Sequence, residues 1–291
     1  MDISVIIPTL NAEHDIEGLL TVLGRQSIQP IEILVVDSAS EDRTIELIRK
    51  HKGVRLLQID RQDFNHGGTR DLALRESRGD FVCFLTQDAV PVSDDYLELL
   101  VAPMVDDSEI AVVSGRQLPK VDARRFEQLV RGFNYPDSSS VRSKRDLKKY
   151  GIKTFFASDT CSAYRRTAYL ECGGFEHVNT NEDMLMAARF IASGMKVAYE
   201  PRAEVYHSHN LTPSQQFARN RAVGSFSKRM RTISCMQVRS VKGAGSSKRS
   251  PLSSFGRAIC SSSSPSVLTA APDFLVTAPA AGPLEKKGYS K

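Results

Sequence analysis

Two aspartates follow apolar segments of the sequence at positions where α/β proteins bind ligands. Asp37 ends the run 32–37, and Asp88 comes shortly after the run 81–85. In open α/β sheets, ligands bind at the carboxyl ends of the strands. There Asp37 can accept hydrogen bonds from a uracil or thymine N–H or from ribose hydroxyls; its alternative is a turn or helix-capping role. Asp88 can hold Mg²⁺ or Mn²⁺ on a diphosphate or be an ordinary turn residue, and it would lie near Asp37 if the two strands were neighbours.

A metal bound by a single carboxylate needs a second protein ligand. His207 and His209 are two residues apart, so in an extended segment their side chains point to the same side. Imidazole suits Mn²⁺ better than Mg²⁺. The alternative is that both histidines are structural residues with satisfied hydrogen bonds.

Paired acids open a predicted helix over residues 182–193. Glu182 and Asp183 at its start can simply complement the helix dipole. In a transferase, Asp183 could instead be the general base that deprotonates an acceptor hydroxyl as it attacks an anomeric carbon.

The most distinctive string runs from Asp63 to Arg70 and reads DFNHGGTR. Adjacent glycines between a His and an Arg, in a loop that enters a predicted helix over 69–77, form a cradle suited to a phosphate or a sugar hydroxyl. The string is neither GxGxxG nor a Walker A loop. Its alternative is a tight turn with an arginine on the helix surface.

Strand and helix patterns alternate through the first half of the chain. Apolar runs predict strands over 3–7, 32–37, 54–59, 81–85 and 111–115, and helical spacing predicts helices over 11–27, 40–50, 69–77 and 94–106. Ser40 and Asp42 are also suited to capping the second of these helices. This alternation specifies βαβ units and a mainly parallel sheet with helices on both faces. Further strands are expected over 157–164 and 198–207, whereas the charged, Ser-rich segment 120–153 has no clear pattern.

The basic character of the chain belongs to its last part. The net charge is +5, but residues 229–291 carry ten Lys/Arg and two Asp/Glu, which leaves −3 for residues 1–228. The basic pI therefore does not indicate nucleic-acid binding by the folded part. The segment 229–291 also holds 13 Ser and 5 Pro and lacks a hydrophobic period, which is typical of disorder. It differs so much from the preceding sequence that a shifted reading frame near Lys228 is a hypothesis, which sequencing the encoding DNA would test.

The remaining composition indicates a cytosolic protein. Five scattered cysteines with no CxxC spacing are expected to be reduced thiols. The first residues lack the features of a signal peptide, and no apolar run approaches the roughly 20 residues that span a bilayer.

Taken together, these motifs resemble the family 2 inverting glycosyltransferases, which have the GT-A fold. The resemblance starts at Val5-Ile6-Ile7-Pro8-Thr9-Leu10-Asn11 and continues through Asp37, the string Asn65 to Arg70, Asp88, and the segment from Gly173 to Asp183. It covers about residues 2–227. The strings FNHGGTR and LTQDA resemble in particular the rhamnosyltransferase branch, whose members build bacterial surface polysaccharides.

The resemblance assigns a role to each matching position. It implies a nucleotide-sugar site made of Pro8, Thr9, Asn11, Asp37, Ser40, His66, Gly67, Gly68, Arg70, Gln87 and Asp88. It implies that Asp88 and His207 hold Mg²⁺ or Mn²⁺ and that Asp183 is the catalytic base. Gly173, Gly174, Phe175 and Glu182 would form the acceptor side. The implied organisation is a nucleotide-binding half over 1–105 and an acceptor half over 106–227, followed by the tail 228–291.

The chain departs from the family pattern at two positions and in its C-terminal part, where the Ser-rich tail stands in place of the family's expected C-terminal helices. Thr86 stands where most members carry the first Asp of the DxD motif, so fewer carboxylates would hold the metal. Gln216-Phe217-Ala218-Arg219 falls where many members have a QxxRW motif, but Asn220 replaces the Trp. The rhamnosyltransferase-like members share the first departure.

The expected reaction moves a sugar, rhamnose from dTDP-rhamnose, to a glycan or lipid-linked acceptor, with peripheral association with the inner membrane. One alternative is a non-catalytic nucleotide-sugar-binding module with a damaged C-terminus. A Rossmann oxidoreductase is disfavoured because Pro8-Thr9-Leu10-Asn11 offers no glycine-rich turn after the first strand.

Overall fold

The computed structural model describes residues 1–212, 214–218 and 221. The predicted tail 228–291, its boundary, and Arg219 and Asn220 of the QxxRW-like segment lie outside these residues.

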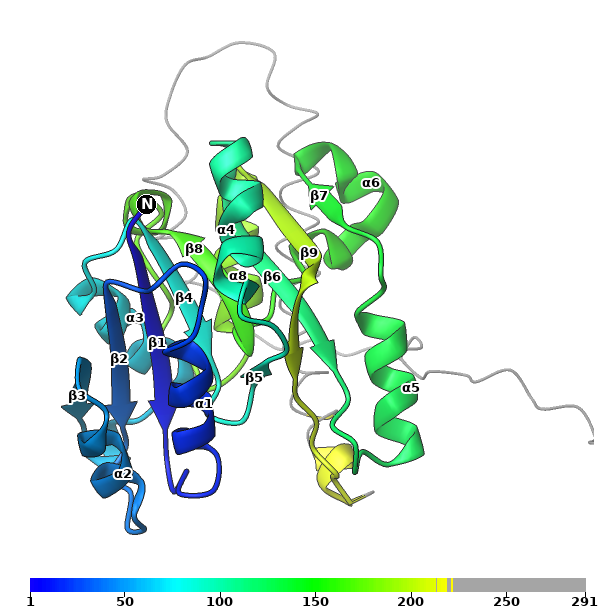
Figure 1. The fold of residues 1–291 in the computed structure, drawn as a ribbon. Coiled ribbons are helices and arrows are strands. Elements are labelled where there is room, and N and C mark those ends of the chain that lie inside the picture. Colours follow the sequence, from blue (N-terminus) through cyan, green and yellow to red (C-terminus); the bar gives the residue numbers. More distant parts are fainter. Residues whose placement is uncertain (213, 219–220, 222–291) are drawn as a thin grey trace, which may run out of the picture. The chain divides into compact units, whose positions relative to one another are not determined.

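One mixed sheet forms the centre of the described part (Figure 1). Its strands lie in the order β3-β2-β1-β4-β8-β6-β9-β5, and β7 also pairs with β9. Their bounds are β1 Ile3–Thr9, β2 Glu32–Asp37, β3 Val54–Gln58, β4 Phe81–Leu85, β5 Val90–Pro91, β6 Ile110–Leu118, β7 Ser140–Arg142, β8 Cys161–Arg165 and β9 Lys196–Tyr206.

Helices connect these strands and cover both faces. The α-helices are α1 Ile16–Leu23, α2 Thr44–Lys50, α3 His66–Glu76, α4 Tyr96–Asp106, α5 Arg125–Asn134, α6 Leu147–Tyr150, α7 Arg166–Glu171 and α8 Glu182–Ala192. Three short 3₁₀ helices cover Arg61–Asp63, Lys144–Asp146 and Gly151–Phe155. The helix predicted over 11–27 covers only Ile16–Leu23, because Asn11 has a left-handed backbone conformation (φ 50°) and the residues after it form a turn in which the Asp15 amide donates to the Ala12 carbonyl.

The sheet is mainly parallel, as predicted, because β1 to β4, β6 and β9 run in one direction, whereas β5, β7 and β8 run in the opposite one. Strands β1 to β4 run parallel to one another, as the βαβ pattern predicts, and β6 runs parallel to β9. Strand β8 lies between β4 and β6 and is antiparallel to both. The apolar pattern of a short buried strand does not encode its direction, and β8 is preceded by irregular chain and short helical turns rather than by a crossover helix.

Each face of the sheet has its own hydrophobic core. Helices α1, α2 and α4 pack on one face, where Leu19, Leu47 and Leu100 meet sheet residues such as Ile7. Helices α3, α7 and α8 pack on the other, where Tyr169 contributes to a second cluster of buried residues. The alternation of side chains along each strand sends neighbouring residues into different cores. The prediction of helices on both faces is therefore confirmed.

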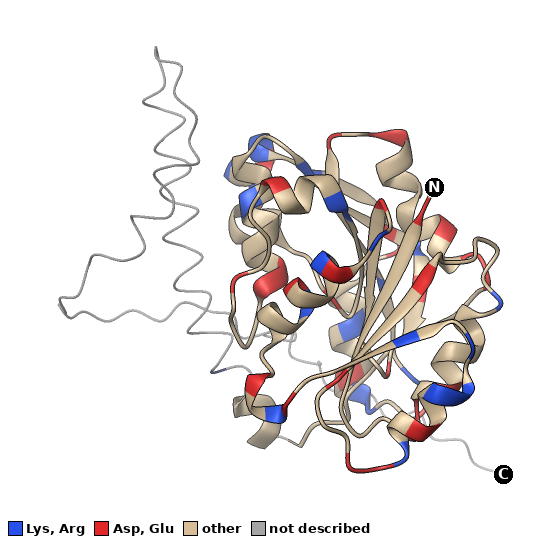
Figure 2. Ribbon diagram, turned by 90° about the vertical axis from the view of Figure 1, so that its left-hand side faces the viewer, with Lys and Arg blue, Asp and Glu red and all other residues tan. Residues whose placement is uncertain are grey.

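The described part has mixed surface charge. Figure 2 shows acidic and basic positions interspersed along its helices and strands. Among the described cysteines, Cys83, Cys161 and Cys172 are free, and the first two are buried. No helix among the described residues has both the length and the apolar character needed to cross a bilayer.

Candidate active site

Two neighbouring strands end at the predicted nucleoside site. Thr9 is the last residue of β1 and lies opposite Asp37, the last residue of β2. The carboxylate of Asp37 is fully buried and accepts hydrogen bonds from the Ser40 amide (2.9 Å) and the Ser40 hydroxyl (2.5 Å). The Thr9 hydroxyl lies 3.4 Å from the same carboxylate. These contacts fix the orientation of Asp37 at the carboxyl edge of the sheet, while Pro8 beside it is half-buried.

The loops that follow β1 and β2 hold each other in place. The amide of Asn11 donates to the Ser40 hydroxyl (2.8 Å), and the Asn11 side-chain oxygen accepts from the Glu41 amide (2.9 Å). The Asp42 carboxylate accepts from the Thr44 amide (2.9 Å) at the start of α2. Asp42 therefore accepts from the first amide of α2, although the N-cap position itself is Arg43, and Ser40 serves the loop contacts instead of capping the helix.

Gln87 joins the end of β4 to the end of β1. Its side-chain oxygen accepts from the Leu10 amide (2.8 Å), and its side-chain nitrogen donates to the Leu10 carbonyl (3.2 Å). Both polar ends of this amide are thus engaged with one residue of the β1 loop. Gln87 positions this loop, and a direct contact with a nucleotide-sugar stays a prediction.

Asp88 lies with both histidines of the predicted metal site. One carboxylate oxygen of Asp88 is 3.4 Å from Nε2 of His207 and 3.7 Å from Nδ1 of His209, and the three ligand atoms all lie within 4.8 Å of one another. Asp88 was expected near Asp37 if their strands were neighbours. They are not, because β1 lies between β2 and β4 in the sheet. Both aspartates therefore flank the end of β1.

The chemistry of this group suits a divalent cation. Nδ1 of the buried His207 lies 3.0 Å from the side-chain oxygen of Gln117, a contact that fixes the ring with Nε2 towards Asp88. A carboxylate facing a ring nitrogen at this distance needs a proton or a metal between them. One carboxylate and two imidazoles form a donor set better matched to Mn²⁺ than to Mg²⁺. Burial alone would raise the pKa of Asp88, but the contacts with His207 and His209 hold it well below its usual range.

The prediction of a loop cradle around the double glycine is wrong, because both glycines lie in a helix. Helix α3 begins at His66, and Asn65 caps it by accepting from the Gly68 amide (2.7 Å). The Gly67 amide donates to the carbonyl of Val178 (2.9 Å). Neither glycine amide is left to bind a phosphate, because both lie in the first turn of the helix and already have acceptors. Gly67 instead permits close packing, since a Cβ there would lie 1.8 Å from the Glu176 carbonyl oxygen.

Arg70 lies buried and paired instead of on the surface of its helix. Its guanidinium lies 2.7 Å from the Glu182 carboxylate and 3.9 Å from that of Asp159. His66, one turn earlier, lies 3.2 Å from Arg70 through Nδ1. Burial and the charge of Arg70 lower the pKa of His66 to about 4, so His66 is neutral at physiological pH. The predicted donor contacts of His66 and Arg70 stay predictions, but the main electrostatic partners of Arg70 are acids of the predicted acceptor side.

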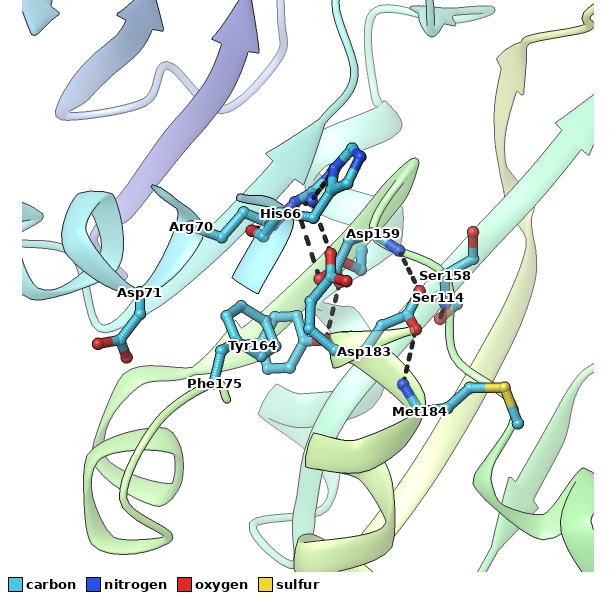
Figure 3. A network of polar contacts seen from close by, with 12 residues as sticks. His66, Arg70, Asp71, Ser114, Ser158, Asp159, Tyr164, Phe175, Asp183 and Met184 are labelled. Atoms are coloured by element: carbon cyan, nitrogen blue, oxygen red, sulfur yellow. Dashed lines mark hydrogen bonds and ion pairs between the residues drawn. The ribbon is translucent and has the colours of Figure 1, made fainter. Parts of the chain in front are cut away.

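Asp183 and Asp159 form the centre of this network (Figure 3). One Asp183 oxygen accepts from the Asp159 amide (3.3 Å), and the other accepts from the Met184 amide (2.7 Å). The Asp159 side chain accepts from the hydroxyls of Ser162 (2.7 Å) and Tyr164 (2.8 Å). Burial raises the pKa of Asp183 well above its usual range, and the charges of Asp159 and Glu182 add to the rise.

Asp159 was missed by sequence reasoning. It is 2 % exposed, and burial raises its pKa to about 6 against the opposing effect of Arg70. The only sequence signal was an isolated acid within the strand predicted over 157–164, and such a position carries no characteristic spacing.

Gln117 was also missed, although it connects the two halves of the site. Its side-chain oxygen accepts from Arg131 and contacts His207, and its side-chain nitrogen donates to the Ser158 hydroxyl (3.0 Å). Ser158 precedes Asp159, whose amide binds Asp183. A continuous chain of polar contacts therefore runs from the histidines to the predicted base.

The predicted acceptor tripeptide serves to position the loop before α8. Gly173 and Gly174 have φ of 86° and 80°, and a Cβ on Gly174 would lie 2.2 Å from an Asp71 oxygen. Phe175 is buried against Tyr169, with ring centroids 4.9 Å apart. Its side chain faces the core and offers no surface to an acceptor, which corrects its expected role. The carboxylate of Glu182 is likewise engaged within the protein, because it accepts a hydrogen bond from Arg70.

Comparison with protein families confirms the resemblance. The family described as "Glycosyl transferase family 2" matches residues 4–173, more than half of the chain. The chain belongs to this family of glycosyltransferases.

Two curated relatives of this glycosyltransferase match most of its length. The O-antigen chain rhamnosyltransferase RfbN of Salmonella typhimurium is 45% identical over 228 residues, which cover 78% of this chain and 72% of the relative. The O-antigen chain rhamnosyltransferase WbaN of Salmonella anatum is 41% identical over 226 residues, covering 77% of this chain and 71% of the relative.

Solved structures share its fold. TarS 1–349 of S. aureus in complex with UDP-GlcNAc has a TM-score of 0.57 at 20% identity, covering 74% of this glycosyltransferase and 61% of that chain. The mannosyltransferase PcManGT from Pyrobaculum calidifontis, in complex with GDP-Man and Mn²⁺, has a TM-score of 0.56 at 19% identity, covering 88% and 79%. The predicted GT-A fold is confirmed.

Proposed function

We propose that this glycosyltransferase moves rhamnose from dTDP-rhamnose to a glycan or lipid-linked acceptor in the synthesis of a bacterial surface polysaccharide, with inversion at the anomeric carbon. The observation that carries the proposal is the chain of contacts from the Asp88–His207–His209 group through Gln117 to Asp183. This chain of contacts supports the proposal because it links the predicted metal group to the predicted base. The two O-antigen rhamnosyltransferases at 45% and 41% identity support the donor sugar and the pathway.

The carboxyl edge of the sheet holds the donor in this proposal. Asp37, oriented by Ser40 and Thr9, accepts hydrogen bonds from the base or ribose. Asp88, His207 and His209 would hold a Mn²⁺ or Mg²⁺ ion. Such an ion supplies Lewis-acid stabilisation of the charge that develops on the leaving diphosphate.

Asp183 accepts the proton in the transfer step. The acceptor oxygen forms a bond to the anomeric carbon while the bond from that carbon to the diphosphate oxygen breaks, and the acceptor proton moves to Asp183. The raised pKa of Asp183 makes it a stronger base than an ordinary aspartate once it is ionised. Amide contacts from Asp159 and Met184 hold the carboxylate in one orientation.

The donor can be tested by thermal unfolding with dTDP-rhamnose, UDP-GlcNAc and GDP-mannose, each with and without Mn²⁺. We expect dTDP-rhamnose with Mn²⁺ to raise the melting temperature most, because a ligand at about 100 times its Kd stabilises the folded state by about 2.7 kcal/mol. His207→Ala should abolish the Mn²⁺-dependent part of the shift. His14→Ala is the matched control, since His14 is 87% exposed and lies outside the site.

Turnover separates the enzyme from a non-catalytic binding module. Transfer of rhamnose to a lipid-linked acceptor, with an inverted linkage by NMR, is the expected result. Binding of dTDP-rhamnose without transfer or hydrolysis would favour the module, and stabilisation by another sugar nucleotide would refute the proposed donor.

A further inference from the structure

Helix α5 carries an apolar stripe on its outer side. Phe126, Leu129 and Phe133 are 56%, 55% and 66% exposed. Their spacing of three and four residues places them on one face of the helix. In Figure 1, α5 lies at the right-hand edge of the described part, outside β6 and β9. Contiguous apolar groups of this kind mark interaction surfaces.

The inner side of α5 is tied to the protein, so its orientation is fixed. Glu127 and Arg131 are buried and form an ion pair at 2.8 Å. Arg131 also donates to Gln117, and the buried Tyr135 that ends the helix packs against Phe156. The helix cannot rotate to bury its apolar stripe without breaking these contacts.

Basic residues precede and follow the apolar stripe in the sequence. Residues 120–153 contain ten Lys/Arg and four Asp/Glu. The exposed cations of this segment are Arg124, Arg125, Lys144, Arg145, Lys148, Lys149 and Lys153. The ammonium of Lys153 lies 5.3 Å from the Phe133 ring, directly beside the stripe.

We propose that this face of α5, defined by Phe126, Leu129 and Phe133 with Arg124 and Arg125 at the start of the helix and Lys153 beside Phe133, docks the protein on an anionic lipid bilayer. An amphipathic helix binds at the interface with its apolar residues in the headgroup–acyl boundary, and nearby Lys and Arg residues are attracted to anionic headgroups. Both features are present here on one helix and its surroundings.

Charge distinguishes the bilayer from two other occupants. A second copy docked through the same face would bring two basic surfaces together, which opposes association. Residues 222–291 of the chain carry eleven Lys/Arg and two Asp/Glu, so they are also a poor electrostatic match for this face. An anionic bilayer complements both the charge and the apolar stripe.

The proposed docking face is coupled to the candidate active site. The Glu127 side chain accepts from the His209 amide (3.3 Å), and Arg131 contacts Gln117, which contacts His207. Binding through α5 would therefore hold the candidate metal group close to the membrane surface, where a lipid-linked acceptor resides. Docking itself does not depend on the donor sugar or on turnover.

The absence of tryptophan from the chain permits a direct test. Phe133→Trp in the full chain introduces a single indole within the stripe, and Leu72→Trp introduces one at an exposed site on α3 as the control. With vesicles of phosphatidylcholine and phosphatidylglycerol, we expect a blue shift of the Phe133→Trp emission and quenching by brominated lipids. The Leu72→Trp protein should bind equally well but show neither change.

Vesicle flotation gives an independent measurement. The variant Phe126→Ser/Leu129→Ser/Phe133→Ser should lose at least about tenfold in bound fraction, because it removes the inserted apolar groups. The matched control Ile31→Ser/Leu72→Ser/Val105→Ser changes three exposed apolar residues elsewhere and should bind like the wild type. Arg124→Glu/Arg125→Glu should also reduce binding, whereas Arg49→Glu/Lys52→Glu on another surface should have a smaller effect.

Several outcomes would overturn the proposal. Vesicle binding that is unchanged in the triple serine variant would assign docking to another part of the chain. A Phe133→Trp emission that is already blue-shifted without lipid would show that protein covers the stripe, and analytical ultracentrifugation would then tell a second copy from the chain's own residues. Binding to neutral vesicles as strong as to anionic ones would refute the role of the basic residues.

Discussion

The backbone amide of Asp159 donates a hydrogen bond to the carboxylate of Asp183 across 3.3 Å. The side chain of Asp159 points towards Ser162 and Tyr164, whose hydroxyls donate to it. Asp159 therefore contacts Asp183 through its backbone amide and not through its carboxylate. Burial raises the pKa of both acids, and the charge of Asp159 adds to the rise at Asp183. The pKa of the predicted base thus depends on its charged neighbours as well as on its own burial.

Other charged groups face this pair from two helices. Glu182 on α8 also raises the pKa of both acids, and Arg70 on α3 lowers it. His66 on α3 is neutral at physiological pH, because its pKa is lowered to about 4. Arg70 is therefore the cation that favours an ionised base.

Asp183→Asn should reduce kcat by about 10²- to 10⁴-fold, because the amide cannot accept the acceptor proton. Binding of the nucleotide-sugar, measured by calorimetry, should change little. In the wild type, kcat should rise with pH as the acid pair loses its proton, since a raised pKa leaves Asp183 protonated over a wider range. The exposed Asp80→Asn is the control. Unchanged turnover in Asp183→Asn would refute the assignment of the base.

Asp159 should make stability depend on pH. Its pKa is about 6 in the folded protein and 3.8 ordinarily, so the folded state keeps a proton that the unfolded chain releases. The free energy of unfolding should therefore fall as pH rises from about 4 to about 6, by at most about 3 kcal/mol. Asp159→Asn should flatten this slope in urea denaturation. An equal slope in both proteins would show that Asp159 ionises normally.

The buried pair of Arg70 and Glu182 should show strong coupling. Arg70→Met or Glu182→Met alone should cost about 3–5 kcal/mol of stability, because each leaves an uncompensated buried charge. The double variant should cost clearly less than the sum of the two. Additive losses in chemical denaturation would mean that the 2.7 Å contact contributes no coupling.

Arg70→Met should also move the pH dependence of kcat to higher pH. Arg70 lowers the pKa of Asp183, so its removal leaves the base protonated at pH values where the wild type is active. This readout distinguishes an electrostatic role from simple loss of stability, since the rate should recover at alkaline pH. A lower rate with an unchanged profile would contradict the electrostatic role.

Gln117→Leu should weaken Mn²⁺ binding by about 10- to 100-fold, because His207 loses the contact that fixes its ring. Isothermal titration with Mn²⁺ measures the effect without requiring turnover. Gln58→Leu, at an exposed position on β3, is the control. An unchanged affinity for Mn²⁺ would show that Gln117 does not position the histidine.

Two glycine substitutions in helices should have opposite effects. Gly67→Ala should destabilise the protein by more than about 2 kcal/mol, because its Cβ would overlap the Glu176 carbonyl and force α3 away from the loop before α8. Gly18→Ala in α1 meets nothing within 4 Å and should stabilise the protein by about 0.5–1 kcal/mol. Similar changes in the two unfolding free energies would contradict the packing role of Gly67.

The sequence by itself determined the framework of the predicted donor side. Hydrophobic periodicity located the strands that end at Thr9 and Asp37, and parallel strands necessarily bring their carboxyl ends to one edge. The two-residue spacing of His207 and His209 correctly predicted that they lie together. These features depend on local pattern, which a single sequence displays directly.

Only the tertiary structure decided the electrostatic surroundings of the predicted base. Arg70 and Glu182 are 112 residues apart, and His207 and Gln117 are 90 apart. No local pattern encodes such contacts, because the first depends on how α8 packs beside α3 and the second on how β9 pairs with β6. For the same reason, the double glycine in α3 suggested a phosphate loop, whereas its conformation is set by the backbone packed against it. The exposure of the apolar face of α5 also depends on the tertiary structure, because the burial of Glu127 and Arg131 turns that face outward.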